Sequence, residues 1–255
     1  MALKASFMAG FESFDLQVES GVKIHGVCVG EGPAVLLLHG HPQSHVTWQE
    51  VAPRLVRAGY RVIASDLRGY GDSSRPEGGE RHINYSKRAM AGDQVSVMRA
   101  LGLERFAVIG HDRGGRVAHR MALDHPGVVE RLAVLDIAPT ATMYGQTNRE
   151  FATRYFWWFF LIQPAPLPER LIEADPEFFL RHHLAAQSQT PGVPNEMLIE
   201  EYLRCYRLPG TIHAICGDYR AAASVDLEHD ARRSTAGMFR KKSLRGKLRM
   251  LYSRF

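Results

Sequence analysis

Residues 108–115, VIGHDRGG, constrain the fold of this chain more than any other segment. An apolar run leads into Asp112, glycines stand two residues before it and two residues after it, and a helical pattern follows. This order predicts a strand, a tight turn and a helix. It is the pattern of a nucleophile elbow, which lifts one side chain clear of a sheet at the N-terminus of a helix. The alternative is a surface turn that happens to contain glycines, but the flanking strand and helix patterns favour the elbow.

Apolar runs and helical patterns alternate along the first half of the chain. Two early segments, 14–18 and 22–29, alternate in hydrophobicity like an antiparallel pair at a sheet edge. Continuous apolar runs then occur at 34–38, 61–64, 105–109 and 132–137, and such runs are typical of strands buried on both faces of a parallel sheet. Helical patterns lie between them at about 48–58, 86–101 and 115–123. The sequence therefore predicts an α/β fold with a mostly parallel sheet flanked by helices.

The character of the sequence changes after Ile137. From Thr140 to about Ala223 it is aromatic-rich, interrupted by prolines and without obvious strands, which predicts a cap of short helices. We therefore divide the chain into a core at residues 1–139, a helical cap at 140–224, and a return to the core with an atypical basic tail at 225–255.

An aspartate at the centre of the elbow predicts a particular chemistry. Most such elbows carry serine, whereas a carboxylate attacks saturated carbon and leaves an ester. This shifts the expected reaction from acyl transfer toward displacement of halide or opening of an epoxide. The turn HGHP at 39–42 ends the third strand and is expected to supply a backbone N–H to an oxyanion site, paired with the N–H of Arg113. His41 in this turn is a candidate substrate-binding residue.

With these segments identified, the chain resembles the haloacetate (fluoroacetate) dehalogenases of the α/β-hydrolase superfamily. The matching stretches are HGHPQ at 39–43, NYSKR at 84–88, GHDRG at 110–114, LDIAPT at 135–140, QPAPLPE at 163–169 and DYRA at 218–221. The first and third fit many hydrolases, whereas QPAP and DYRA are much more specific. The resemblance spans about residues 10–235. It implies an α/β-hydrolase fold with a helical cap, Asp112 as nucleophile and a small haloacid as substrate.

Two arginines follow the proposed nucleophile. Arg113 and Arg116 stand one and four residues after Asp112, so a helix would place both near the same opening. Two guanidinium groups suit a small substrate carboxylate and also stabilise Asp112 as an anion. The alternative is that one of them pairs with a surface acid, which applies more to Arg116 than to Arg113.

The resemblance also implies a halide pocket in the cap, formed by a His-Trp pair and one tyrosine. Trp158 and Tyr219 match this pattern, and an indole N–H and a phenol O–H are suitable donors to a leaving halide. The histidine position is Trp157, which weakens the case for fluoride. Packing within the cap is the alternative role for Trp157 and Trp158. An epoxide hydrolase is the second enzymatic interpretation. It needs two cap tyrosines, Tyr219 and an unaligned one such as Tyr155.

The same resemblance makes Asp136 the acid that orients a catalytic histidine, with a buried strand-end aspartate capping a turn with Thr140 as the alternative. No segment of the Gly-His-x-x-Pro type follows, and the last histidine, His229, is expected to be structural. We expect the C-terminal part, with the last strands of the sheet and the closing helix that the resemblance implies, to be truncated or replaced, for example by a frameshift. Asp112 would then start the reaction, but hydrolysis of the ester would be impaired. A catalytically inactive fragment is the third interpretation.

Charge and cysteine content limit the classes of partner and cofactor that the chain is expected to have. The net charge is +5, but residues 238–255 carry seven basic and no acidic residues, which leaves 25 basic and 27 acidic residues in the body of the chain. The charge therefore does not indicate a nucleic-acid partner, although a tail that contacts a membrane or RNA is an alternative. Three separated cysteines indicate neither a disulfide framework nor a metal set, and we expect a cytoplasmic protein without metal or cofactor. We expect no membrane partner, and the chain is compatible with a homodimer.

Overall fold

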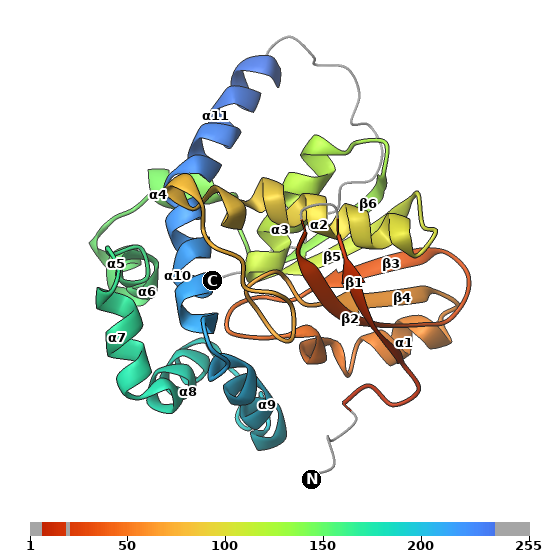
Figure 1. Cartoon of the computed structure of the whole chain (residues 1–255), viewed down its shortest axis with the longest axis horizontal. Coiled ribbons are helices and arrows are strands. Elements are labelled where there is room, and N and C mark those ends of the chain that lie inside the picture. The colour runs from red at the N-terminus through yellow and green to blue at the C-terminus, as the bar shows by residue number, and fades with distance from the viewer. Residues whose placement is uncertain (1–6, 19–20, 238–255) are drawn as a thin grey trace.

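A six-stranded sheet forms the centre of the molecule. The computed structural model describes residues 7–18 and 21–237, and its strand order is β1-β2-β4-β3-β5-β6 (Figure 1). The strands are β1 (Glu12–Gln17), β2 (Lys23–Val29), β3 (Ala34–Leu38), β4 (Arg61–Ser65), β5 (Phe106–His111) and β6 (Val129–Leu135). β1 pairs antiparallel with β2, and β2 with β4, while β3, β4, β5 and β6 run parallel. The predicted antiparallel edge pair and the mostly parallel sheet are confirmed.

Helices cover both faces of the sheet because successive side chains of a strand point to opposite faces. Leu36 and Leu38 belong to the same apolar cluster as the buried side chains of α2 and α3, whereas Val35 and Leu37 pack with η1 and α1. The helices of this part are η1 (His45–Trp48), α1 (Ala52–Arg57), η2 (Glu80–Tyr85), α2 (Lys87–Ala100) and α3 (Asp112–Asp124). The helix predicted over residues 48–58 is thus shorter than expected and follows a 3-10 turn.

The strand predicted over residues 132–137 differs from expectation. β6 ends at Leu135 and forms one edge of the sheet among the described residues, where only its Val134 is buried. The prediction that this run is buried on both faces is therefore wrong. An apolar run indicates a strand, but it does not reveal how many neighbours that strand has.

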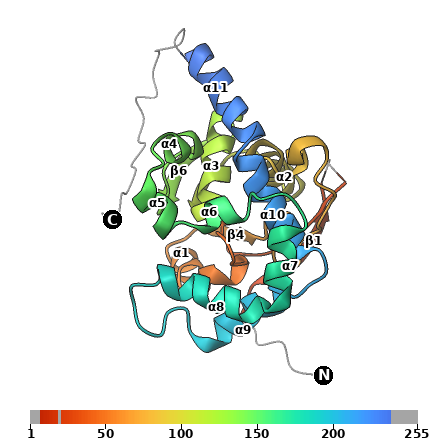
Figure 2. The same cartoon turned by 90° about the vertical axis from the view of Figure 1, so that its left-hand side faces the viewer.

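From Thr140 to Gly237 the described chain contains helices and no strand, as its prolines predicted. The helices are α4 (Thr140–Gly145), α5 (Arg149–Arg154), α6 (Trp157–Phe160), α7 (Leu167–Ala174), α8 (Pro176–Gln187), α9 (Glu196–Tyr206), α10 (Thr211–Ala222) and α11 (Val225–Gly237). Helices α5 to α9 lie together at one end of the sheet, and α10 and α11 lead the chain back past α3 (Figures 1 and 2).

Two further points from the sequence concern membrane-spanning helices and the basic C-terminal tail. Within residues 7–18 and 21–237, no helix is both long and apolar enough to cross a membrane. The basic tail expected at the C-terminal end, residues 238–255, lies outside the described residues.

Candidate active site

The turn between β5 and α3 places Asp112 at the first position of α3, with a positive φ of 47° that few non-glycine residues adopt. Close backbone approaches explain the neighbouring glycines. A Cβ atom at Gly110 would lie 2.4 Å from the carbonyl oxygen of Gly114, and one at Gly114 would lie 2.3 Å from that of His39. The N–H of Gly114 donates to this His39 oxygen at 2.9 Å. The strand, tight turn and helix predicted around Asp112 are therefore present and are bonded to the loop after β3.

The carboxylate of Asp112 is charged and partly exposed. Its Oδ1 accepts the backbone N–H of His41 at 3.0 Å, and its Oδ2 accepts Nη1 of Arg116 at 3.3 Å. Burial raises the pKa of Asp112, but the charges of Arg116, His111 and Arg113 and the His41 N–H outweigh it and lower the pKa to about 2. The side chain keeps 22% of its surface exposed, so an ionised carboxylate is accessible at neutral pH.

A cavity of about 390 Å³ lies in front of this carboxylate. Core and cap both contribute to its walls, because the cap helices lie at the same edge of the sheet as Asp112. The lining residues are Asp112, Arg116, Asp136, Ile137, Ala138, Met143, Arg154, Tyr155, Trp157, Trp158, Ala186, Gln187 and Gln189. The structure thus brings together Asp112, Arg116, Asp136, Trp157 and Trp158, five of the residues singled out from the sequence.

Arg116 connects the nucleophile to the cap. Its side chain is only 4% exposed, and its guanidinium carbon lies 4.8 Å from the ring centre of Trp158. Nη1 binds Asp112, whereas the buried Nε has no hydrogen-bond partner in the described part of the chain. Arg116 therefore pairs with the proposed nucleophile rather than with a surface acid, and it keeps an unused donor.

Arg113 is the arginine that pairs with another acid, contrary to the expectation from the sequence. Its Nε donates to Oδ2 of Asp218 at 2.8 Å, and its Nη2 donates to Oδ1 at 2.6 Å and to the Asp218 carbonyl oxygen at 2.9 Å. The guanidinium also lies 4.1 Å from the ring centre of Tyr219. Only Nη1 has no partner among the described residues, so Arg113 mainly holds α10 against α3 and adds positive charge behind Asp112.

A buried network of charges continues from Asp218 to the start of α2. Lys87 Nζ pairs with Asp218 and lies 3.7 Å from Oδ2 of Asp226, while the Lys87 N–H donates to Oδ1 of Asp226 at 2.8 Å. Burial raises the pKa of Asp226 to about 6. The sequence prediction missed this network, although Asp218 stands in the DYRA stretch that carried part of the resemblance.

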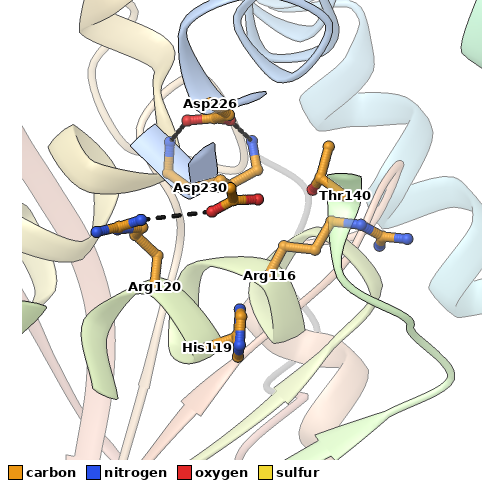
Figure 3. A pocket seen from close by; sticks show the side chains of 7 residues that line it. Arg116, His119, Arg120, Thr140, Asp226 and Asp230 are labelled. Carbon is orange, nitrogen blue, oxygen red and sulfur yellow. Dashed lines mark hydrogen bonds and ion pairs between the residues drawn. The ribbon is translucent and has the colours of Figure 1, made fainter. Parts of the chain in front are cut away.

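A second, much smaller pocket of about 10 Å³ lies behind Arg116, with room for about one water. Arg116, His119 and Arg120 of α3 line it with Thr140 and with Asp226 and Asp230 of α11 (Figure 3). The guanidinium of Arg116 points away from Asp226 in this view. This pocket therefore belongs to the joint between α11 and the core, and not to the space in front of Asp112.

The predicted halide-pocket residues come from two cap helices. Trp157 and Trp158 of α6 are buried and line the large cavity. Tyr219 of α10 is not among the lining residues, but its ring contacts Trp158 edge to face at 6.2 Å and His41 at 5.6 Å between centres. The side chain of His41 is itself buried, and both of its ring nitrogens have no hydrogen-bond partner among the described residues.

Asp136 also adopts a positive φ, 54°, directly after β6, and it lines the cavity with Asp112. It is exposed, and the N-cap of α4 is Pro139, so the alternative of a buried aspartate capping the turn at Thr140 is wrong. No described histidine bonds to its carboxylate. His229 lies on α11, where its Nδ1 is 3.9 Å from Asp226 and its carbonyl oxygen accepts from Arg120, outside the large cavity.

One group of side chains has the composition of a metal site. His25, His45 and Asp66 bring one ligand atom each within 4.8 Å of one another. The Asp66 carboxylate already accepts the backbone N–H and Nδ1 of His45 at 2.7 and 3.0 Å and the N–H of Asp72 at 2.9 Å. These contacts satisfy the buried acid and order the loops after β3 and β4, so they account for the cluster without an ion.

Comparison with known proteins shows which family and which enzymes this chain is similar to. Residues 33–197 match the protein family described as alpha/beta hydrolase fold. A fluoroacetate dehalogenase from Burkholderia sp. is 51% identical over 224 residues, which are 86% of this chain and 73% of that protein. A soluble epoxide hydrolase from Corynebacterium sp. (strain C12) is 37% identical over 216 residues, 84% of this chain and 73% of that protein.

Solved structures are similar over the same extent. A putative acyltransferase from Salmonella enterica has a TM-score of 0.89 and 53% identity, and the match covers 92% of this chain and 77% of that one. A putative epoxide hydrolase from Pseudomonas aeruginosa has a TM-score of 0.85 and 44% identity, with 90% and 76% covered. Names of both enzyme types predicted from the aspartate elbow therefore occur among the proteins similar to this chain.

Proposed function

Because this chain belongs to the alpha/beta hydrolase fold family, we propose that it displaces halide from a small 2-haloacid, with Asp112 as the nucleophile. The 51% identity to a fluoroacetate dehalogenase supports this choice of reaction. The observation that carries the proposal is the ionised, partly exposed Asp112 carboxylate at the wall of the large cavity, paired with Arg116.

In the proposed first step, one carboxylate oxygen of Asp112 attacks the carbon that bears the halogen. The new C–O bond forms as the carbon–halogen bond breaks, and the halide leaves with the bonding electron pair. The His41 N–H and Arg116 hold the carboxylate in place. The product is an alkyl ester of Asp112, the covalent intermediate expected of a carboxylate nucleophile.

The cavity offers positive charge for the substrate carboxylate. Arg116 has an unpartnered Nε, and Arg154 of α5 lines the same cavity with its side chain 63% exposed. Guanidinium groups bind carboxylates through two parallel hydrogen bonds, which suits an acid more than a neutral substrate. Arg154 was not predicted from the sequence, since an exposed arginine in a cap helix has no distinguishing pattern.

Completion of the reaction requires a base that activates water toward the ester. General-base assistance is worth about 10²–10⁴-fold, and within the described residues no histidine bonds to Asp136, the proposed orienting acid. We therefore expect the ester on Asp112 to be hydrolysed more slowly than it forms. Halide release by the 255-residue chain should show a burst of about one halide per chain with chloroacetate or fluoroacetate. Continued release at the burst rate would contradict the expected delay, and absence of any release would contradict the proposed reaction.

Epoxide opening is the second candidate, and one observation favours it. Tyr155 lines the cavity with Asp112, and Asp112 and Asp136 add to the effect of burial in raising its pKa. Its phenol therefore stays protonated at neutral pH and could donate to an epoxide oxygen. Assays of epoxide opening and of halide release on the same preparation separate the two candidates. Replacement of Tyr155 by Phe should lower only epoxide opening.

A further inference from the structure

The cavity in front of Asp112 is larger than a haloacetate requires. Its volume is about 390 Å³. Cavities of about 300–1,000 Å³ hold ligands of the size of a drug molecule, whereas the carbon chain of a haloacetate has only two atoms. A substrate that fills this cavity therefore has a longer chain than a haloacetate.

The exposure of the lining residues divides the cavity into an inner end and a mouth. Arg116 is only 4% exposed, and Trp157 and Trp158 are buried. These side chains form the inner end beside Asp112. A substrate whose halogenated carbon reaches Asp112 therefore has its neighbouring carboxylate close to Arg116.

The mouth is formed by exposed polar side chains of the cap. Arg154 of α5 is 63% exposed, and Gln187 and Gln189, at the end of α8 and just after it, are exposed as well. A guanidinium and two amides all offer N–H donors, and no acidic residue of the described cap lines this cavity. The mouth is therefore suited to a second anionic group, at some distance from the one that Arg116 receives.

Arg154 is free to bind such a group. Its Nη1 lies 4.0 Å from Oε1 of Glu150, and both side chains of this pair are exposed. An exposed pair of this kind contributes about 0–1 kcal/mol, so a ligand carboxylate can replace Glu150 at little cost. Asp136, the second acid of the cavity wall, forms an ion pair with neither Arg116 nor Arg154 among the described residues. Both arginines therefore keep positive charge for the ligand.

The two arginines lie on either side of one phenol. Burial raises the pKa of Tyr155, and the charges of Asp136, Arg154, Asp112 and Arg116 then shift it in opposite directions. All four charged groups thus lie within electrostatic reach of the same ring, which also lines the cavity. A single small molecule can therefore contact Asp112 and both arginines.

We infer that the substrate is a 2-halogenated dicarboxylic acid, whose carboxylate beside the halogenated carbon binds Arg116 and whose second carboxylate binds Arg154. This inference rests on the proposed function, because it keeps the displacement at Asp112. The new C–O bond forms at the carbon that bears the halogen, the halide leaves with the bonding electron pair, and both carboxylates stay ionised. Binding at both ends also fixes which carbon faces Asp112.

The test compares halide release in the first turnover from two matched pairs of acids. 2-Chlorosuccinate and 2-chlorobutanoate have the same chain length and the same kind of reacting carbon, but only the diacid has a second carboxylate. 2-Chloroglutarate and 2-chloropentanoate form the longer pair. At substrate concentrations below saturation, the wild type should react about 10-fold faster with the diacid of at least one pair.

Two variants of α5 assign this preference. Arg154→Gln keeps N–H donors but loses the charge, so it should remove the preference for the diacid and change the rate with the monoacid by less than about 2-fold. The matched control is Arg149→Gln, because Arg149 is also exposed on α5 but does not line the cavity. Its rates should equal those of the wild type.

Other results would overturn the inference. Equal rates with the two acids of each pair in the wild type would do so, as would an equal loss with diacid and monoacid in Arg154→Gln. A similar loss of preference in Arg149→Gln would assign it to the general charge of α5 instead. If chloroacetate reacts and neither diacid does, the inference fails while the proposed function stands. If neither chloroacetate nor any of the longer acids releases halide, the proposed function itself fails.

Discussion

The two walls of the cavity are built in different ways. The core wall is formed by the chain directly after two strands. Asp112 and Arg116 follow β5 across a turn that the glycines permit, and Asp136 follows β6. The cap wall collects side chains from separate helices, with Trp157 on α6 and Gln187 on α8. Local backbone rules determine the first wall, whereas the packing of helices against one another determines the second. Chemistry in the core wall can therefore be predicted from spacing, and chemistry in the cap wall cannot.

The largest expected effect is a loss of stability on replacing Arg113, because this buried residue binds Asp218 and so holds α10 to α3. Arg113→Gln would leave Asp218 with less compensation for its buried charge and should lower the free energy of unfolding by about 3–5 kcal/mol. Arg88→Gln is the control, since Arg88 is 46% exposed and pairs with Asp124, and it should change stability by less than about 1 kcal/mol. Urea unfolding measures both variants. If Arg113→Gln lowered the free energy of unfolding as little as Arg88→Gln does, the buried network would not hold α10 to α3.

The elbow glycines test the local rules of the core wall. A methyl group at Gly114 would lie 2.3 Å from the His39 carbonyl oxygen, so Gly114→Ala should lower the free energy of unfolding by about 3 kcal/mol. A methyl group at Gly92 in α2 would meet no atom within 4 Å, and Gly92→Ala should raise stability by up to about 1 kcal/mol. Thermal melting of the two variants checks the pair, and a Gly114→Ala chain as stable as the wild type would contradict the close approach.

The stability that α11 gains from its contact with the core should depend on pH. The pKa of Asp226 is raised to about 6 in the folded chain from 3.8 in the unfolded chain. The folded state therefore binds more protons between these values, and the contribution of Asp226 to stability is fully present below pH 4 and is lost as pH rises through 6. The loss amounts to up to about 3 kcal/mol. Asp226→Asn should remove this slope in denaturant unfolding between pH 4 and 7; an unchanged slope would assign it to another group.

Arg116 tests the chemistry of the core wall. Arg116→Gln removes a donor from Asp112 and the proposed contact with the substrate carboxylate, so the first-turnover rate with chloroacetate should fall by about 10²-fold. The methyl ester of chloroacetate has no carboxylate, and with this substrate the same variant should differ much less from the wild type. An equal loss with both substrates would limit Arg116 to positioning Asp112.

The comparison of the two walls also explains how far sequence reasoning succeeded. The strands, the elbow and the helical nature of the cap follow from local patterns, and the structure contains all of them. The pairing of Arg113 joins residues 105 positions apart, and that of Lys87 with Asp218 joins residues 131 positions apart. Such pairs depend on how α10 returns to α3, which no local pattern encodes. The place of Arg154 in the cavity wall and the exposure of β6 depend in the same way on which elements become neighbours, so neither could be predicted.

The central claim is that Asp112 is the nucleophile, and mass spectrometry tests it most directly. After incubation with chloroacetate, the chain should carry one carboxymethyl group, and digestion at low pH should locate it on the peptide that contains Asp112. The Asp112→Asn chain should carry none, because an amide is a far weaker nucleophile than the carboxylate. Modification of another residue, or equal labelling of the Asp112→Asn chain, would contradict the claim.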